Sequence, residues 1–372
     1  MNERLKISFC LIVKNEEKFI RGCLASISEL ANEIIVVDTG SCDRTKDICG
    51  EFHAKIYNYE WNDDFAAARN FGLKKATGDW IFWIDADEKL AVSDKKLLFD
   101  QLRNKNLDAL LIELVNFCGS YPEDENNSYT YFNNRLFRNH LGLSFKGQIH
   151  EYLDLKSAGK PIKSGKTSAI KILHFGYMDE QVESKNKSER NLRLLQKASM
   201  TDDYSPWIDY YISNEFYRLK MYNEAFSRVN ISILRFLLLG LKPPSMLYKL
   251  KYDILIMSGS AAGSLEGIEK AILLYPDYPD LHFYKGLILL DNKRYKDAIS
   301  VFEYCLTLNE YNENYLILKG VCSFLALYYI GVCYEAADEL DKAKNSYAKA
   351  LSIYPGYKDA QNRLSWVSSR LT

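Results

Sequence analysis

The sequence of 372 residues lacks an excess of charge of one sign, a long apolar run and a cysteine pair at metal-binding spacing. Because 48 basic residues nearly balance 49 acidic ones, the composition gives no sign of a nucleic-acid partner. The longest uncharged run, residues 320–334, is shorter than the ~20 residues that a membrane span needs, and we expect it to be a buried helix. We therefore expect neither a transmembrane segment nor bound nucleic acid.

Cysteine residues are present without a recognisable framework. The eight of them are scattered and form no Cys-Xaa-Xaa-Cys pair, which favours reduced thiols over disulfides or a structural zinc site. A strand pattern begins at Lys6 with no charged and then apolar leader before it, so we expect no secretory signal. These features predict a cytoplasmic protein.

The first half of the chain alternates two kinds of pattern. Short β-branched or aromatic runs alternate with helical apolar stripes from Lys6 to about Phe175, which predicts an α/β domain with a mostly parallel sheet. Expected strands cover residues 7–13, 33–38, 55–59 and 80–84. Expected helices cover residues 17–30, 45–52 and 65–75.

After about Asp179 the strand patterns vanish and the chain is helical to its end. Small and aromatic residues there follow the spacing of tetratricopeptide repeats, in which small residues let two helices approach closely. The residues are Gly286, Leu289, Ala298, Phe302 and Cys305 in one repeat, and Gly331, Tyr334, Ala343, Tyr347, Ala350 and Pro355 in the next. We predict an α/β domain at residues 1–178 and an all-α repeat domain at 179–372. An ordinary helical domain is the alternative.

The acidic end of one strand suggests a metal site. The apolar run that begins at Trp80 ends in Asp85-Ala-Asp87, where a buried strand emerges into solvent. Two carboxylates at this spacing suit Mg²⁺ or Mn²⁺, which commonly bridge the phosphates of a substrate. A solvated strand end is the alternative. Because the carboxyl ends of parallel strands share one edge, we expect Asp38, which ends another strand, to lie near this pair.

Four motifs in order resemble those of family 2 glycosyltransferases, which have the GT-A fold, a Rossmann-like fold of nucleotide-diphospho-sugar transferases. The motifs are Val13-Lys-Asn15-Glu16, Asp38-Thr-Gly-Ser-Cys-Asp-Arg-Thr, Trp61-Asn-Asp-Asp64-Phe-Ala-Ala-Ala-Arg69-Asn and Asp85-Ala-Asp87. The resemblance covers about residues 5–178. It implies an enzyme that transfers a sugar from a nucleotide-sugar donor.

The resemblance also implies a role for each motif. Residues at the first two strand ends would hold the nucleobase: Val13, Asn15, Glu16 and Asp38. Asp64 and Arg69 would lie beside the base and the diphosphate, although Arg69 could also be an arginine on a helix surface. Asp85 would reach the ribose or the donor sugar. Asp87 would bind Mn²⁺ or Mg²⁺ on the diphosphate, whose departing charge a divalent ion stabilises.

Two later segments resemble further parts of this family. Gly147-Gln-Ile-His150-Glu151 is similar to a Gly-Xaa-Val-His-Glu segment of a subgroup that includes lipopolysaccharide-core glucosyltransferases, at the place where an inverting enzyme keeps its base. Glu151 is our first choice as base and His150 the second, because an imidazole also titrates near neutrality. A glutamate at a helix start beside a packed histidine is the alternative.

A histidine and two arginines complete the candidates. His174 ends an apolar strand where the family commonly completes the metal shell, and a core histidine is the alternative. Arg135 and Arg138 resemble the family's Arg-Xaa-Phe-Arg and could meet donor or acceptor.

The order of the two domains resembles the sublancin-type peptide S-glycosyltransferases, which modify cysteines of bacteriocin precursors. This resemblance implies transfer of a hexose, with UDP-glucose as first-choice donor, to a peptide held with help from the repeats. A glycosyltransferase of lipopolysaccharide core or another glycan is the second hypothesis. A repeat scaffold without catalytic activity is the third. Exposed repeat ends also permit a homodimer.

Overall fold

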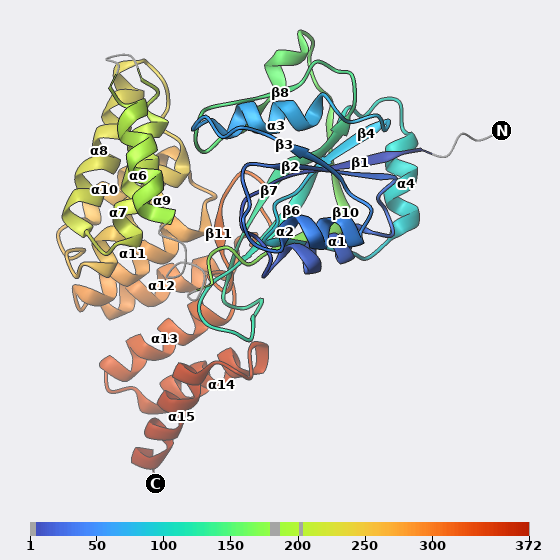
Figure 1. The fold of residues 1–372 in the computed structure, drawn as a ribbon. Coiled ribbons are helices and arrows are strands. Elements are labelled where there is room, and N and C mark those ends of the chain that lie inside the picture. The colour runs from blue at the N-terminus through green and yellow to red at the C-terminus, as the bar shows by residue number, and fades with distance from the viewer. Residues whose placement is uncertain (1–4, 179–186, 201–203, 372) are drawn as a thin grey trace. The chain divides into compact units, whose positions relative to one another are not determined.

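The computed structural model describes residues 5–178, 187–200 and 204–371 (Figure 1). They divide into two compact units, one formed by Met1–Asp124 with Thr130–Leu194 and the other by Glu125–Tyr129 with Leu195–Thr372. The predicted boundary between residues 178 and 179 lies at the edge of a stretch outside the described residues, and it stays a prediction.

The N-terminal unit is built on a mixed sheet with the strand order β3-β2-β1-β4-β7-β6-β10-β5. Strands β1, β2, β3 and β4 are parallel neighbours, as predicted, while β7 and β5 each run antiparallel to a neighbour. The strands are β1 (Ile7–Val13), β2 (Glu33–Asp38), β3 (Lys55–Asn58), β4 (Trp80–Trp83), β5 (Glu88–Val92), β6 (Ala109–Phe117), β7 (Ser128–Arg138) and β10 (Ser164–His174). The α/β prediction is confirmed.

Helices pack on both faces of this sheet because its central strands are apolar on both sides. Alternate residues of β1 point to opposite faces: Phe9 joins the larger core beside Ile20 of α1, whereas Cys10 joins a smaller core with Ala66 of α3. Figure 1 shows α3 on one side of the sheet and α1 and α2 on the other. The helices are α1 (Ile20–Ile27), α2 (Thr45–Glu51), α3 (Phe65–Leu73) and α4 (Lys95–Arg103).

Glu33, at the start of β2, joins three segments at the edge opposite the carboxyl ends of the parallel strands. Its carboxylate accepts hydrogen bonds from the Ser8 hydroxyl at 2.5 Å, the Thr77 amide at 2.5 Å and the Lys55 ammonium at 2.9 Å. Burial by itself raises the pKa of Glu33, but these hydrogen bonds outweigh it and lower the pKa to about 2.

Glu33→Gln is expected to lower the free energy of unfolding by about 1–3 kcal/mol at pH 7, since an amide replaces the charged acceptor. The folded pKa lies below the ordinary 4.5, so this stabilisation is present above pH 4.5 and is lost as the pH falls toward about 2. Urea unfolding at pH 7 and pH 3 should therefore show a smaller difference at pH 3. The exposed Glu29→Gln should change little at either pH. An equal difference at both values would contradict the assignment.

A small second sheet lies beside α3 and is formed by β8 (Ser144–Lys146) and β9 (Tyr152–Asp154), followed by a 3₁₀ turn at Leu155–Ala158. The Asn70 side chain both donates to the Phe145 carbonyl at 2.9 Å and accepts from the Phe145 amide at 2.7 Å. The Phe65 amide donates to the Gln148 carbonyl at 2.8 Å. Helix α3 therefore fixes the loop that carries His150 and Glu151.

The second unit is helical, as predicted. Its elements are α7 (Trp207–Arg218), α8 (Tyr222–Leu238), α9 (Ser245–Met257), α10 (Leu265–Leu274), α11 (Pro279–Asp291), α12 (Tyr295–Cys305), β11 (Ile317–Leu318), α13 (Phe324–Ala336), α14 (Leu340–Ile353) and α15 (Lys358–Leu371). The division between the two units falls within helix α6 (Lys187–Ala198), between Leu194 and Leu195. Within the described ranges, no helix combines the length and apolar character needed to cross a membrane.

The repeat glycines allow the close approach that the sequence predicts. A Cβ on Gly286 of α11 would lie 2.5 Å from the Phe302 ring of α12, and one on Gly331 of α13 would lie 2.5 Å from the Tyr347 ring of α14. Each glycine therefore lets an aromatic ring of the next helix pack against backbone. Pro355 follows Tyr354, the C-cap of α14, consistent with its predicted role as a helix stop.

Candidate active site

The carboxyl ends of β1, β2 and β4 lie side by side at one edge of the sheet. Val13 pairs with Asp38 in the β1–β2 ladder, and the Ile84 amide after β4 donates to the Cys10 carbonyl of β1 at 3.2 Å. The predicted side chains at these three strand ends therefore share one edge, which is where ligands of open α/β sheets bind.

The loops after β1 and β2 hold each other in place. The Asn15 amide donates to the Ser41 hydroxyl at 3.0 Å, and the Asn15 side chain accepts the Cys42 amide at 2.8 Å. The Glu16 amide donates to the Thr45 hydroxyl at 2.7 Å. Asp38 is almost fully buried and accepts the amides of its own loop, Gly40 and Ser41, at 3.2 Å. Hydrogen bonds within the protein therefore hold these two loops against each other without help from a ligand.

Asp64 is the N-cap of α3, because its carboxylate accepts the Ala67 amide at 2.8 Å. The cap starts the helix that carries Arg69 one turn later. Arg69 is only 8% exposed, so it is not an arginine on a helix surface.

Arg69 joins two candidate residues from distant parts of the chain. Its guanidinium donates to Asp85 at 2.7 Å and to Glu151 at 2.6 Å, and it lies 4.7 Å from the centre of the Trp83 ring. A buried arginine held by two carboxylates fixes both of them, because leaving either one unpaired in the interior is costly. The predicted base and the predicted sugar-binding aspartate therefore lie on either side of one guanidinium.

A second arginine supports Asp85 from the other side. Arg135 makes two hydrogen bonds, of 2.8 and 3.1 Å, to Glu88, and Glu88 also accepts the Asp85 amide at 2.8 Å. Arg135 lies 3.9 Å from the Asp85 carboxylate. Burial raises the pKa of Asp85, but Arg69 and Arg135 outweigh it and keep that pKa below its ordinary value. Asp85 is therefore held ionised.

Asp87, in the loop between β4 and β5, faces His174, the last residue of β10. The Asp87 carboxylate lies 3.6 Å from Nε2 of His174, and Nδ1 of His174 is 2.8 Å from the Asn116 side-chain oxygen. If Nδ1 carries the proton, it donates to Asn116 and leaves Nε2 as the metal-binding atom. A side chain at Gly176 would fill the space between the two, since its Cβ would lie 2.5 Å from His174 Nε2 and 2.8 Å from the Asp87 carboxylate.

The Asp87 carboxylate and the His174 imidazole suit Mn²⁺ or Mg²⁺ as ligands, if phosphate oxygens and water fill the remaining coordination positions. One carboxylate and one imidazole alone do not form a complete protein cage. Consistent with that, the described residues contain no group of three or more His, Cys, Asp or Glu side chains placed to hold a metal ion.

The loop between β8 and β9 presents His150 and Glu151 through an unusual backbone. Gly147 has a φ of 96° and His150 a φ of 52°, so the chain turns sharply twice within four residues. This turn directs the Glu151 carboxylate to Arg69. The Glu151 side chain is 11% exposed, so it is nearly buried.

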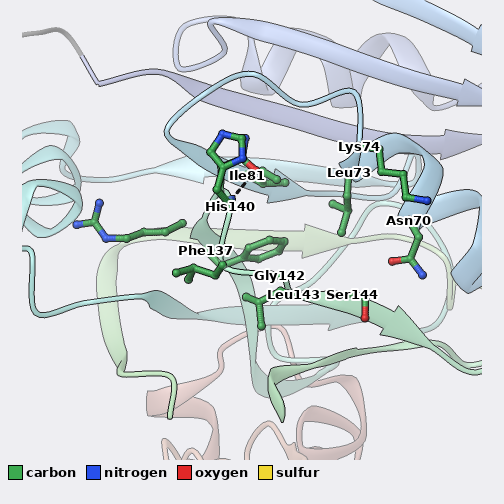
Figure 2. A pocket seen from close by; sticks show the side chains of 12 residues that line it. Asn70, Leu73, Lys74, Ile81, Phe137, His140, Gly142, Leu143 and Ser144 are labelled. Atoms are coloured by element: carbon green, nitrogen blue, oxygen red, sulfur yellow. Dashed lines mark hydrogen bonds between the residues drawn. The ribbon is translucent and has the colours of Figure 1, made fainter. Parts of the chain in front are cut away.

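Arg138 is directed away from the cluster around Arg69. It pairs with Trp80, at the start of β4, and its guanidinium donates to the carbonyls of Leu107 at 2.8 Å and Asn104 at 3.0 Å. It borders a cavity of about 470 Å³ that lies between the end of α3 and the loop after β7. Figure 2 shows this cavity with Phe137 and His140 beside it. No other predicted site residue lines it.

Sequence reasoning missed Glu88 and gave Arg135 no defined role. The signal for Glu88 was its position as a third acidic residue directly after Asp85-Ala-Asp87. The structure instead buries it at the start of β5, opposite His174 of β10.

Comparison with known families agrees with this geometry. Residues 8–158 match the model of Glycosyl transferase family 2, and residues 324–357 match that of the Tetratricopeptide repeat. The chain therefore joins a family 2 glycosyltransferase domain of GT-A fold to a C-terminal domain with a tetratricopeptide repeat.

Individual relatives are similar to this chain over part of its length. The chain is 34% identical to a tetratricopeptide-repeat protein of Synechococcus elongatus over 51% of its own length and 47% of the relative's. It is 29% identical to the SPbeta prophage-derived glycosyltransferase SunS of Bacillus subtilis over 60% of its own length and 52% of SunS. It is also 29% identical to the lipopolysaccharide core biosynthesis glycosyltransferase LpsC of Rhizobium meliloti, over 50% of this chain and 70% of LpsC. The chain thus spans about half the length of the first two relatives.

Proposed function

We propose that this protein is a metal-dependent inverting glycosyltransferase that moves a hexose, with glucose from UDP-glucose as first choice, to a peptide side chain. A cysteine thiol of a bacteriocin precursor, modified in the cytoplasm, is the first-choice acceptor. The observation that carries the proposal is the Arg69 clamp, which holds Asp85 and Glu151 within 2.7 Å of one guanidinium. It joins the donor side of the site to the acceptor side.

The donor would lie along the carboxyl edge of the sheet. Asp38 and the loop of Val13, Asn15 and Glu16 would hold the nucleobase, and Asp64 would start the helix beside the diphosphate. Asp85, kept ionised by two arginines, would accept hydrogen bonds from the ribose or sugar hydroxyls. We assign Arg138 to the support of backbone carbonyls instead of the donor.

Asp87 and His174 would hold the divalent cation, with Gly176 leaving room for it. A cation bound there supplies positive charge to the departing diphosphate. In a single displacement, the acceptor sulfur or oxygen bonds to the anomeric carbon while the bond to the diphosphate oxygen breaks, and its electron pair leaves with the nucleotide. The acceptor proton passes to Glu151, or to His150 as second choice, unless a thiol has already lost it.

The peptide acceptor is supported by the similarity to SunS and by the tetratricopeptide repeat, a module whose concave face commonly binds peptides. The similarity to LpsC favours a second candidate, a glycosyltransferase of lipopolysaccharide core or another glycan. The third hypothesis, a scaffold without activity, gives no reason for a doubly paired buried arginine in the same region as a facing Asp87–His174 pair.

Calorimetry with UDP separates the enzyme from the scaffold. We expect UDP to bind at least ~10-fold more tightly with Mn²⁺ than without it, and Gly176→Ala to remove most of that gain by filling the cation space. Gly50→Ala is the matched control, because a Cβ at Gly50 of α2 meets nothing within 4 Å. If UDP does not bind, or binds equally with and without Mn²⁺, the result would favour the scaffold hypothesis over the enzyme.

A further inference from the structure

Helix α8 of the helical unit is apolar on two sides. One side packs into a core with α7 and α9 through Ala225, Val229, Ile233 and Phe236. The other side presents Ile231, Leu234 and Leu238 to solvent, and Leu238 is 76% exposed. A helix that is apolar on both sides is normally covered on both sides.

The exposed apolar surface continues beyond α8. Three leucines at the end of the helix and in the following loop, Leu237, Leu239 and Leu241, are also more than half exposed. The loop is joined to the end of α10, because the Lys242 ammonium donates to the Leu274 carbonyl at 2.6 Å and the Tyr275 hydroxyl donates to the Pro243 carbonyl at 2.6 Å. Leu273, 81% exposed, and Leu274 therefore extend the patch.

These eight residues define what we name the leucine face: Ile231, Leu234, Leu237, Leu238, Leu239, Leu241, Leu273 and Leu274. By their exposed fractions they present on the order of 800 Å² of largely apolar surface, above what monomeric proteins usually leave open and close to one side of a standard protein interface.

The shape and charge of the leucine face indicate its occupant. Ile231, Leu234 and Leu238 are spaced by three and then four residues, which is the seam of a helix that packs along another helix.

The neighbouring cations are already engaged by the protein itself. Lys242 is bound to the Leu274 carbonyl, and Arg235 donates to the Tyr204 carbonyl at 2.6 Å and lies 3.9 Å from Asp209. Lys270 of α10 is largely exposed but is likewise paired, with Glu266 at 2.6 Å, whereas binding to an anionic lipid surface needs several unpaired cations that point outward. An apolar helix face of this kind is complementary to the same helix face on a second copy of the chain.

We propose that the leucine face is the interface of a twofold homodimer, in which α8 packs antiparallel against α8 of a second copy. In such an isologous contact Leu234 lies near the axis, and Ile231 of one copy faces Leu238 of the other. This inference does not depend on the proposed reaction, because it concerns only residues of the helical unit.

Sedimentation velocity on the full chain tests the proposal. The wild type should be dimeric at ~10 µM, whereas Leu234→Glu with Leu238→Glu should weaken the dimer by at least ~100-fold, because charges would enter an apolar seam. Ile353→Glu, at an exposed apolar position of α14, should leave the dimer intact. Leu234→Cys should form a disulfide between copies on oxidation, which checks the axis without depending on the stability of the charged variant. Circular dichroism confirms that each variant is folded.

Three outcomes would overturn the proposal. One is a wild-type monomer at ~100 µM, and another is a dimer that the double substitution leaves unchanged. The third is a monomer that sediments with phosphatidylcholine vesicles and loses this property on double substitution, which would make lipid the occupant. UDP and Mn²⁺ binding, measured on the same samples, reports separately on the proposed function.

Discussion

Replacing Asp87 by asparagine is expected to lower kcat by about 10³-fold or more, with the fold unchanged. Asp87 provides the only carboxylate of the Asp87–His174 pair, and a neutral amide binds hard cations weakly. The substitution therefore removes charge from the place where the leaving diphosphate develops it. Because this loss falls mainly on the transition state, kcat should fall more than KM rises.

Release of UDP from UDP-glucose, measured over a range of Mn²⁺ concentrations, checks this expectation. Asp100→Asn is the matched control, since Asp100 is half exposed on α4 and should be replaceable without effect. Raising Mn²⁺ should restore part of the Asp87→Asn activity if the amide still binds the ion weakly. Full activity of Asp87→Asn at low Mn²⁺ would remove Asp87 from the metal site.

The strands that carry the proposed donor site could be predicted because their signals are local. The structure places β2 at Glu33–Asp38, as the sequence predicts, and the expected strand at residues 80–84 is β4 at Trp80–Trp83. A buried parallel strand is a short apolar run ended by polar residues, and it can be recognised without knowing its neighbours. The last repeat was predictable for the same reason, since its spacing of small and aromatic residues is local.

The support of Asp85 could not be predicted, because it depends on pairing between distant segments. Arg135 and Arg138 look equivalent in the sequence, yet three residues apart in a strand they point to opposite faces. Arg135 lies 3.6 Å from the centre of the Trp83 ring, beside the site, whereas Arg138 lies over Trp80 at the start of β4. Only the register of β7 on β4 decides which arginine meets the acidic loop.

Arg69 is a second residue whose partners could not be predicted from local sequence, and one of those partners is the proposed base, Glu151. Its two carboxylate partners are separated from it by 16 and 82 residues, so no local pattern could reveal the clamp. The clamp also restrains Glu151, because the Arg69 guanidinium holds its carboxylate in place through a 2.6 Å hydrogen bond. A serine hydroxyl, which must lose its proton during attack, needs a competent base far more than a thiol, of which a few per cent is ionised at neutral pH.

Glu151→Gln should therefore separate the two kinds of acceptor. The glutamine keeps the size of the side chain and can still accept a hydrogen bond from Arg69, but it cannot take a proton. We expect transfer to a serine peptide to fall by about 10²–10⁴-fold and transfer to its cysteine twin by less than ~10-fold. The two peptides must differ only at the acceptor residue, and the rates are measured by mass spectrometry at saturating UDP-glucose.

His150→Asn, measured in parallel, tells which side chain of the loop carries the base. If His150 accepts the proton, the serine-specific loss should appear in that variant and not in Glu151→Gln. A structural collapse of the loop would lower the rate of transfer to both peptides alike, because the proposed donor site would move with Arg69. Equal losses for serine and cysteine in both variants would therefore contradict base catalysis at residues 150 and 151, and with it the argument that the chemistry of this site favours a thiol.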